Sequence, residues 1–196
     1  ARFDQGRYDE ILLTGDIHQT NATKIGISRK LVKTVTYAFL YGAGDTKIGH
    51  SYDKQLPEDE ARKKGKEIRA AYIAAIPGLK ELLEAVHKAS EKGYVLGIDR
   101  RRILVDSKHK SLNYLLQGSS AILAKRWMVL TNENLPQTAR QLAFIHDELQ
   151  YEVEKKDLED LKFLLELTAV QAGEFYNLRC PIAAESVSGK NWAETH

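Results

Sequence analysis

The order of its amphipathic segments constrains the fold of this chain more than any other feature. Pro57 and the three acidic residues after it suit the start of a helix, because the negative charges stabilise the positive end of the helix dipole. Apolar spacing continues to Ile76, and Pro77-Gly78 separates this helix from a second one that stops at Gly93. Two later helices are predicted over residues 111–134 and 157–176, and strands are predicted within residues 94–105, 141–153 and 179–196.

This order predicts an α+β fold, in which a helical region is followed by an antiparallel sheet with helices packed against it. A chain of 196 residues can bury a core as one domain, or as a larger and a smaller subdomain. No run of 18 apolar residues occurs, so no membrane span is expected. Cys180 is the single cysteine, which excludes an internal disulfide and weakly favours a reducing compartment.

Basic residues are concentrated in one part of the chain, although the net charge of +2 is too small to indicate nucleic-acid binding by itself. Five Lys and Arg residues and one acid lie between Lys24 and His50. A local excess of this kind suits contact with a polyanion. It suits a solvated helix face equally well, so the charge pattern leaves both interpretations open.

The stretch from residue 29 to residue 44 carries two basic and two phenolic side chains at intervals of four: Arg29, Lys33, Tyr37 and Tyr41. In a helix this interval would place them on one gently turning ridge. The guanidinium fork and the lysine charge suit phosphate oxygens, while the tyrosine rings suit a sugar or a base. The alternative is a solvated basic edge with tyrosines that belong to the core.

The same stretch leaves helix and strand open. β-Branched residues such as Val32 favour a strand. Ser28 is a suitable N-cap, however, and Leu31, Val35 and Ala38 would form an apolar stripe along a helix. The balance favours the helix.

A predicted hairpin places two carboxylates, Asp147 and Glu148, at its bend, with His146 beside them. Mg²⁺ in proteins is commonly held by one or two carboxylates together with substrate phosphates, so this bend is a candidate metal site. An acidic turn is also a common surface feature. Phosphoryl transfer with two metal ions moreover needs carboxylates from more than one segment.

Two further motifs carry polar groups that suit either ligand binding or a structural role. Asn113 and Gln117 lie one helical turn apart before Gly118, where their amides suit base edges, sugars or neighbouring backbone groups. His18 in the sequence GDIHQT suits a phosphate or a metal, or a structural role. The histidines and the cysteine show no zinc-ligand spacing.

These motifs, taken in this order, resemble those of the family A (polymerase I-like) DNA polymerases over nearly the whole chain. Arg29-xxx-Lys33-xxx-Tyr37-xxx-Tyr41-Gly42 is similar to the motif of the fingers helix in that family, and IHDEL at residues 145–149 is similar to its palm motif. The stretches ARFDQGRYDEIL, YAFLYGAG and NWAETH look most like the phage replicative branch.

The resemblance implies an incomplete right-hand polymerase fold: the end of a palm connection at residues 1–14, fingers at 15–93 and the C-terminal part of the palm at 94–196. It implies a cytoplasmic, template-directed enzyme that adds dNTPs to a primer 3′-hydroxyl with two Mg²⁺ ions. The residues that it implies as dNTP-binding are His18, Arg29, Lys33, Tyr37 and Tyr41. It implies Asp147, Lys33 and Glu148 as catalytic, Asp147 as the metal ligand, and Arg101, Asn113, Gln117 and His146 as DNA-binding.

One departure from the family pattern limits these expectations. The second metal-binding aspartate of the family lies in a D-x-S-x-x-E-L-R-like motif, which this sequence lacks. We therefore expect no activity from this chain without the missing N-terminal polymerase portion. The expected partners are that portion, primer-template DNA and dNTPs. The alternative function is a non-catalytic nucleotide- or nucleic-acid-binding module that retains the fold.

Overall fold

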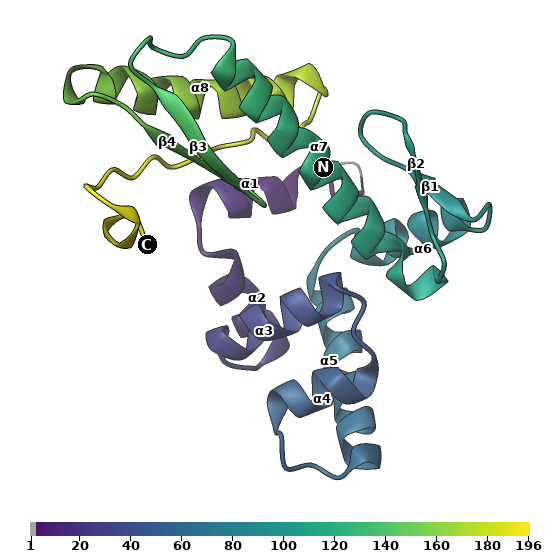
Figure 1. The fold of residues 1–196 in the computed structure, drawn as a ribbon. Coiled ribbons are helices and arrows are strands. Elements are labelled where there is room, and N and C mark those ends of the chain that lie inside the picture. Colours follow the sequence, from purple (N-terminus) through teal and green to yellow (C-terminus); the bar gives the residue numbers. More distant parts are fainter. Residues whose placement is uncertain (1–2) are drawn as a thin grey trace. The chain divides into compact units, whose positions relative to one another are not determined.

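The computed structural model describes residues 3–196, and its elements group into two compact units (Figure 1). Unit 1 runs to Leu96 and resumes over Arg102–Leu116. Unit 2 contains Gly97–Arg101 and Gln117–His196. The long helix α7 (Ser111–Asn132) therefore contributes residues to both units.

Unit 1 is mainly helical and ends with a short antiparallel hairpin. Its helices are α1 (Arg7–Thr14), α2 (Ile17–Ile25), α3 (Arg29–Leu40), α4 (Asp45–Tyr52), α5 (Glu58–Ala75) and α6 (Leu79–Ser90). The hairpin pairs β1 (Tyr94–Leu96) with β2 (Arg102–Leu104), and a short 3₁₀ helix, η1 (Lys108–Lys110), leads into α7. Residues from α3 to the start of α7 form one buried core: Val35, Phe39, Ile48, Ile68, Tyr72, Ile76, Leu79, Val86, Val95 and Leu112.

Helix α3 forms in spite of its β-branched residues because one of its faces is buried. Val32 and Val35 are fully buried, and Phe39 is 5% exposed, so these side chains make one apolar stripe at helical spacing. The predicted helix is thus confirmed. The predicted stripe of Leu31, Val35 and Ala38 was only partly right, since Leu31 and Ala38 are half-buried beside the stripe.

Local hydrogen bonds define both ends of α3. The Ser28 hydroxyl accepts the Leu31 backbone N–H at 3.2 Å, which is an N-cap contact. Gly42 follows the helix with φ 71°, in the left-handed region where glycine has no steric penalty. The Ala43 N–H then reaches back to the Ala38 carbonyl at 2.8 Å, and this Schellman motif ends the helix.

Helices α4 and α5 pack backbone to backbone through two buried glycines. A Cβ atom on Gly49 would lie 1.8 Å from the Ala61 carbonyl oxygen. A Cβ atom on Gly65 would lie 1.7 Å from the Asp45 carbonyl oxygen. Arg69 on α5 also donates from Nε to Asp45 Oδ1 at 2.5 Å, so an ion pair supplements the close contact.

Unit 2 combines the rest of α7 with a second hairpin and one more long helix. Strands β3 (Arg140–Ile145) and β4 (Glu148–Glu152) are antiparallel, with Ile145 opposite Glu148 and an irregularity between Gln141 and Ala143. A short 3₁₀ helix, η2 (Lys155–Asp157), precedes α8 (Leu158–Phe175), and another, η3 (Trp192–Glu194), lies near the end of the described chain.

Buried polar contacts join α7 to α8. The Thr131 and Thr168 hydroxyls lie 2.8 Å apart, and both residues are buried. The Trp127 indole N–H donates to the Leu165 carbonyl at 2.9 Å. Because each of these groups has a partner, their burial carries no desolvation penalty from an unsatisfied polar atom.

The strand predicted for residues 179–196 is wrong, because that segment forms no strand in the structure, which describes all of it. Pro181 has no N–H to donate to a sheet. The Ser186 N–H donates to the Glu166 carboxylate at 3.2 Å, so a side chain of α8 takes the bond that a neighbouring strand would need.

The other elements agree with the sequence to within a few residues: the helix after Pro57, the helix before Gly93, the two later helices and both hairpins. The predicted α+β class is confirmed. Across residues 3–196, none of the helices combines the length and the apolar composition that a membrane span requires.

The close approach of α4 and α5 makes a stability prediction. We expect Gly49→Ala to lower the free energy of unfolding by about 3 kcal/mol, because the new methyl group meets a backbone carbonyl that cannot rotate away. Urea denaturation followed by circular dichroism measures this change. Gly44→Ala is the matched control: φ at Gly44 is −68° and nothing lies within 4 Å of the added Cβ atom. Equal stability of the two variants would contradict the contact.

Candidate nucleotide-binding ridge and acidic turn

The α3 ridge consists of four side chains on the side of α3 opposite its buried stripe: Arg29, Lys33, Tyr37 and Tyr41. Tyr37 is 48% exposed and Tyr41 is 56% exposed, and their rings stack with centroids 6.5 Å apart and planes 19° apart. Lys33 is exposed and makes no hydrogen bond or ion pair with any residue that the structure describes. The ridge therefore presents a free ammonium group beside two aromatic faces.

Asp16 holds the first residue of the ridge. Its carboxylate accepts the Gln19 N–H at 2.9 Å as the N-cap of α2, and it accepts from Arg29 Nε at 2.7 Å. The Gln19 N–H, and then the Arg29 guanidinium, lower the pKa of Asp16. The contact uses Nε of Arg29, so it fixes the direction of the guanidinium fork.

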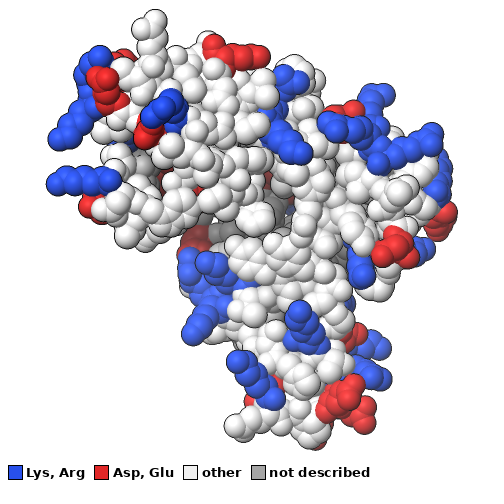
Figure 2. Space-filling model, in the orientation of Figure 1, with Lys and Arg blue, Asp and Glu red and all other residues white. Residues whose placement is uncertain are grey.

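His18 lies in the first turn of α2, two residues after Asp16. Its ring is half-buried, and Nδ1 is buried without a hydrogen-bond partner among the described residues. Lys and Arg side chains gather over the surface of α2 and α3 in unit 1 (Figure 2). Phosphate oxygens are acceptors that suit such a set of donors.

The predicted amide pair lies on α7, one turn apart. Asn113 is half-buried and Gln117 is exposed, and neither side chain hydrogen-bonds to a described residue. Arg101, in the turn of the β1–β2 hairpin, forms an ion pair with Asp99 and is exposed. Basic side chains gather over this hairpin in Figure 2.

The acidic turn of unit 2 is the two-residue bend between β3 and β4, formed by His146 and Asp147. His146 has φ 55°, a left-handed conformation that is costly for a residue with a side chain. Positive φ at the first position is what a tight hairpin bend requires. Asp147 is exposed and makes no hydrogen bond or ion pair with the residues from 3 to 196, so its carboxylate is available to a cation.

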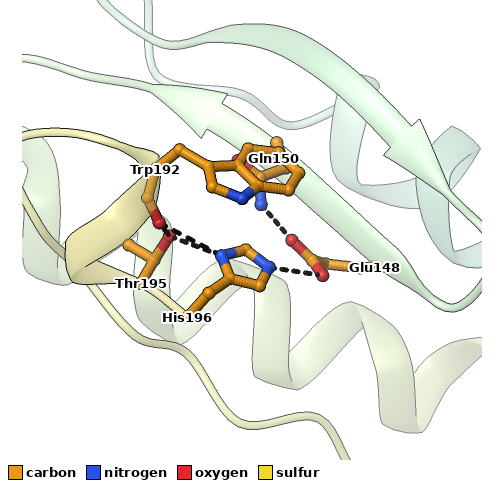
Figure 3. Close-up of polar contacts among 5 residues, drawn as sticks. All are labelled: Glu148, Gln150, Trp192, Thr195 and His196. Atoms are coloured by element: carbon orange, nitrogen blue, oxygen red, sulfur yellow. Dashed lines mark hydrogen bonds and ion pairs between the residues drawn. The ribbon is translucent and has the colours of Figure 1, made fainter.

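Glu148 differs from Asp147 because both of its carboxylate oxygens are engaged (Figure 3). Oε1 accepts from the Gln150 amide, and Oε2 lies 3.1 Å from His196 Nε2. Gln150, and then His196, lower the pKa of Glu148, and the bond to Glu148 raises the pKa of His196. Trp192 stacks on the His196 ring, with centroids 4.4 Å apart and planes 3° apart.

The sequence reasoning missed Asp16 and His196. GDIHQT pointed to His18, although the acid at its second position is the one that contacts Arg29. A Ser, Thr, Asn or Asp residue just before a helix is an N-cap signal and could have drawn attention to Asp16. No local signal indicates His196, because its partner is 48 residues away along the chain.

The candidate metal ligands among the described residues are few. No group of three or more His, Cys, Asp or Glu side chains within residues 3–196 is placed to hold a metal ion. Asp147 fits Mg²⁺ as one oxygen ligand, because it is exposed and unpaired. The α3 ridge belongs to unit 1 and the acidic turn belongs to unit 2.

Both units of the chain are similar in sequence to known proteins. The sequence profile of DNA polymerase family A matches residues 4–194. A DNA-directed DNA polymerase of Escherichia phage Phieco32 is 35% identical over 200 residues, which cover 96% of this chain and 32% of that protein. The DNA-directed DNA polymerase of Escherichia phage T7 is 29% identical over 222 residues, which cover 100% of this chain and 31% of that protein.

A solved structure has the same fold. The POL domain of Pol1 from M. smegmatis, in complex with DNA primer-template and dNTP, superposes with a TM-score of 0.74 at 22% sequence identity. The match covers 91% of this chain and 34% of that one. This chain spans about a third of the length of the phage relatives. Because the family profile covers residues 4–194, the resemblance found in the sequence is confirmed, and the chain belongs to DNA polymerase family A.

Proposed function

We propose that this chain is part of a template-directed DNA polymerase that adds deoxynucleotides to the 3′-hydroxyl of a DNA primer. The observation that carries the proposal is the exposed α3 ridge, with its two basic and two aromatic side chains, in a chain of this family. Residues 15–93 would form the fingers, residues 94–196 the C-terminal part of the palm, and residues 1–14 the end of a palm connection. The relatives named as polymerases support DNA and dNTPs as partners.

The α3 ridge would bind the incoming nucleotide along its length. Arg29 and Lys33 supply positive charge for the triphosphate, and the half-buried ring of His18 in the first turn of α2 would also contact it. Tyr37 would lie beside the sugar, and Tyr41 would stack at the templating position. The two rings already stack on each other, so a flat surface for these contacts is present before a ligand arrives.

The reaction forms a bond between the primer 3′-oxygen and the α-phosphorus, and it breaks the bond to the oxygen that leaves with pyrophosphate. Lys33, free of other partners, would donate a proton to that leaving oxygen. Asp147 would hold Mg²⁺, and bound Mg²⁺ ions stabilise the attacking and leaving oxygens. Glu148 lies next to this ligand in the chain.

The remaining predicted residues would contact the primer and template. Asn113 and Gln117, whose amides have no partner among the described side chains, would bind minor-groove acceptors, which are similar for every base pair. Arg101 would contact the phosphate backbone, and His146 would lie near the primer end. These contacts check the shape of the duplex rather than its sequence.

The second metal-binding carboxylate would come from polymerase residues outside this chain. That proposal follows from two observations: the described residues hold no cluster of three metal-binding side chains, and the chain spans about a third of its relatives. The first of these observations also favours the second candidate function, a non-catalytic module that binds nucleotides or nucleic acid.

Lys33 gives the first functional prediction. In the full-length polymerase we expect Lys33→Ala to slow single-nucleotide incorporation by about 100-fold, because both a phosphate contact and a proton donor are lost. Rapid-quench primer extension at saturating dNTP measures this rate. Lys30→Ala, which removes another exposed lysine of the same helix, should stay within about twofold of the wild type. Equal losses in the two variants would mean that only the total charge matters.

Asp147 gives the second functional prediction. We expect Asp147→Asn in the full-length polymerase to reduce Mg²⁺-dependent extension on the order of 1,000-fold, because the change removes the charge that holds the metal. The melting temperature should not change, since Asp147 is exposed and unpaired. Asp160→Asn, at an exposed position of α8, is the control. Wild-type extension by the Asp147 variant would remove the proposed metal role.

The isolated chain gives the third. Residues 1–196 alone should bind dNTP in equilibrium dialysis but extend no primer, because one of the carboxylates that the two-metal reaction needs is missing. Adding the upstream polymerase portion should restore synthesis. Synthesis by the isolated chain would refute the incomplete metal site, and binding without synthesis in the full-length protein would support the non-catalytic module.

A further inference from the structure

The connection between α3 and α4, here called the glycine turn (residues 42–44), has few side-chain atoms with which to fix its own position. Gly42 has φ 71°, and a Cβ atom on Gly44 would meet no atom of the described residues within 4 Å. The turn borders an open pocket of about 470 Å³, whose lining includes all three turn residues and Arg69. Packing alone therefore leaves the glycine turn room to move.

Arg69 of α5 holds this turn through three contacts. Its Nε donates to Asp45 Oδ1 at 2.5 Å, at the start of α4, and its Nη2 donates to the Ala43 carbonyl within the turn. The guanidinium also lies over the Phe39 ring, 5.6 Å from the ring centroid. One planar group thus contacts the last turn of α3, the glycine turn and the first residue of α4.

These contacts need a guanidinium rather than a positive charge alone. The guanidinium presents Nε and Nη2 as separate donors in one rigid plane, whereas a lysine ammonium is a single charge on a flexible chain. The side chains of Arg69 and Asp45 are 29% and 32% exposed, so water screens their attraction less than it screens a fully exposed pair. The bond to the Ala43 carbonyl is charge-assisted, and such bonds are stronger than neutral ones.

Tyr41, the C-cap of α3, lies between the groups that Arg69 contacts. Its ring is exposed and stacks on Tyr37, so burial in the core does not fix it. Its backbone is joined to Phe39 on one side and to Ala43 on the other, two residues away in each direction. The position of the Tyr41 ring therefore depends on the contacts that Arg69 makes.

We propose that Arg69 is a positioning residue which, by holding the glycine turn, sets where the Tyr41 ring lies and so contributes to the choice of the correct nucleotide. This inference rests on the proposed function, in which Tyr41 stacks at the templating position. In this assignment Arg69 acts through Tyr41 rather than on the substrate itself. A group that contacts a substrate needs neighbours that fix its own geometry, and Arg69 supplies that support from another helix.

The test uses the full-length polymerase and compares a matched dNTP with a mismatched one. The ratio of the two kcat/KM values measures discrimination. We expect Arg69→Met to lower this ratio by about 10-fold, because a displaced Tyr41 ring no longer tests the shape of the new base pair. For the matched dNTP kcat should stay within about threefold, since Arg29 and Lys33 lie at the other end of the α3 ridge.

Arg69→Lys is a second variant that keeps the charge opposite Asp45 and removes the forked donor. It should lower the discrimination ratio by about threefold, between the wild type and Arg69→Met. A wild-type ratio in Arg69→Lys would contradict the need for the fork. A wild-type ratio in Arg69→Met would overturn the positioning role altogether.

The control is another arginine of the same helix. Arg62 pairs with Glu58 at 3.7 Å, and this exposed ion pair lies wholly within α5. Arg62→Met removes an arginine and an ion pair from α5 without removing a contact of the glycine turn, so discrimination should stay within about twofold of the wild type. An equal fall of the ratio in Arg62→Met and Arg69→Met would show that only the charge of α5 matters and would overturn the specific role of Arg69.

A double-variant cycle identifies the route of the effect. If Arg69 acts through Tyr41, adding Arg69→Met to Tyr41→Ala should leave the discrimination ratio within about twofold of that of Tyr41→Ala alone. A further 10-fold loss would overturn the proposal, because it would mean that Arg69 acts by a separate route.

A structural measurement checks the glycine turn apart from catalysis. The Gly42 N–H donates to the Phe39 carbonyl at 3.0 Å, and the Ala43 N–H donates to the Ala38 carbonyl at 2.8 Å. In hydrogen–deuterium exchange these two amides should exchange about 10-fold faster in Arg69→Met and at the wild-type rate in Arg62→Met. Unchanged exchange in Arg69→Met would refute the hold on the turn.

The outcomes separate this inference from the proposed function. A full-length wild type that extends no primer would refute the proposed function, whatever the exchange rates are. An active wild type whose discrimination survives Tyr41→Ala would refute the templating role of Tyr41. An active wild type that loses discrimination in Tyr41→Ala but not in Arg69→Met would refute only the positioning role of Arg69.

Discussion

The burial of one face of α3 determines where its opposite face can act. Val32, Val35 and Phe39 pack into the core of unit 1, and fully burying each such side chain contributes about 1.5–3 kcal/mol. The helix-propensity deficit of a β-branched residue is only about 0.5 kcal/mol, so burial outweighs it. Because that face is buried, the basic and aromatic side chains of the α3 ridge are exposed to solvent.

The sequence predicted best those features that depend only on residues close together in the chain. The helix starts, the glycine stops and both hairpins follow from capping and turn preferences, as at Ser28 and Gly42. The segment after residue 178 was predicted wrongly, because its sequence does not show whether a sheet has a free edge that it could join. In the structure the Ser186 N–H bonds to a side chain of α8 instead. Strand pairing is a long-range property, and one strand's pattern does not contain it.

In the candidate site too, the sequence indicated the contacts between near neighbours and missed the contacts between distant residues. Spacing along one helix indicated the α3 ridge, since its members are neighbours in sequence as well as in space. His196 could not be identified from the sequence, because its contact with Glu148 joins residues far apart in the chain. The two acids of the turn also look equivalent in sequence, and only their contacts distinguish the anchored Glu148 from the free Asp147.

The ion pair between Asp16 and Arg29 has a consequence for selectivity. A mobile side chain loses about 0.5–1.5 kcal/mol of entropy when a ligand immobilises it, and Asp16 already restricts Arg29 before any ligand is present. The same carboxylate competes for the guanidinium and reduces the positive potential around it. If Arg29 binds the triphosphate as proposed, that ligand must outweigh Asp16, and this competition would favour polyphosphates over ligands with a single weak charge.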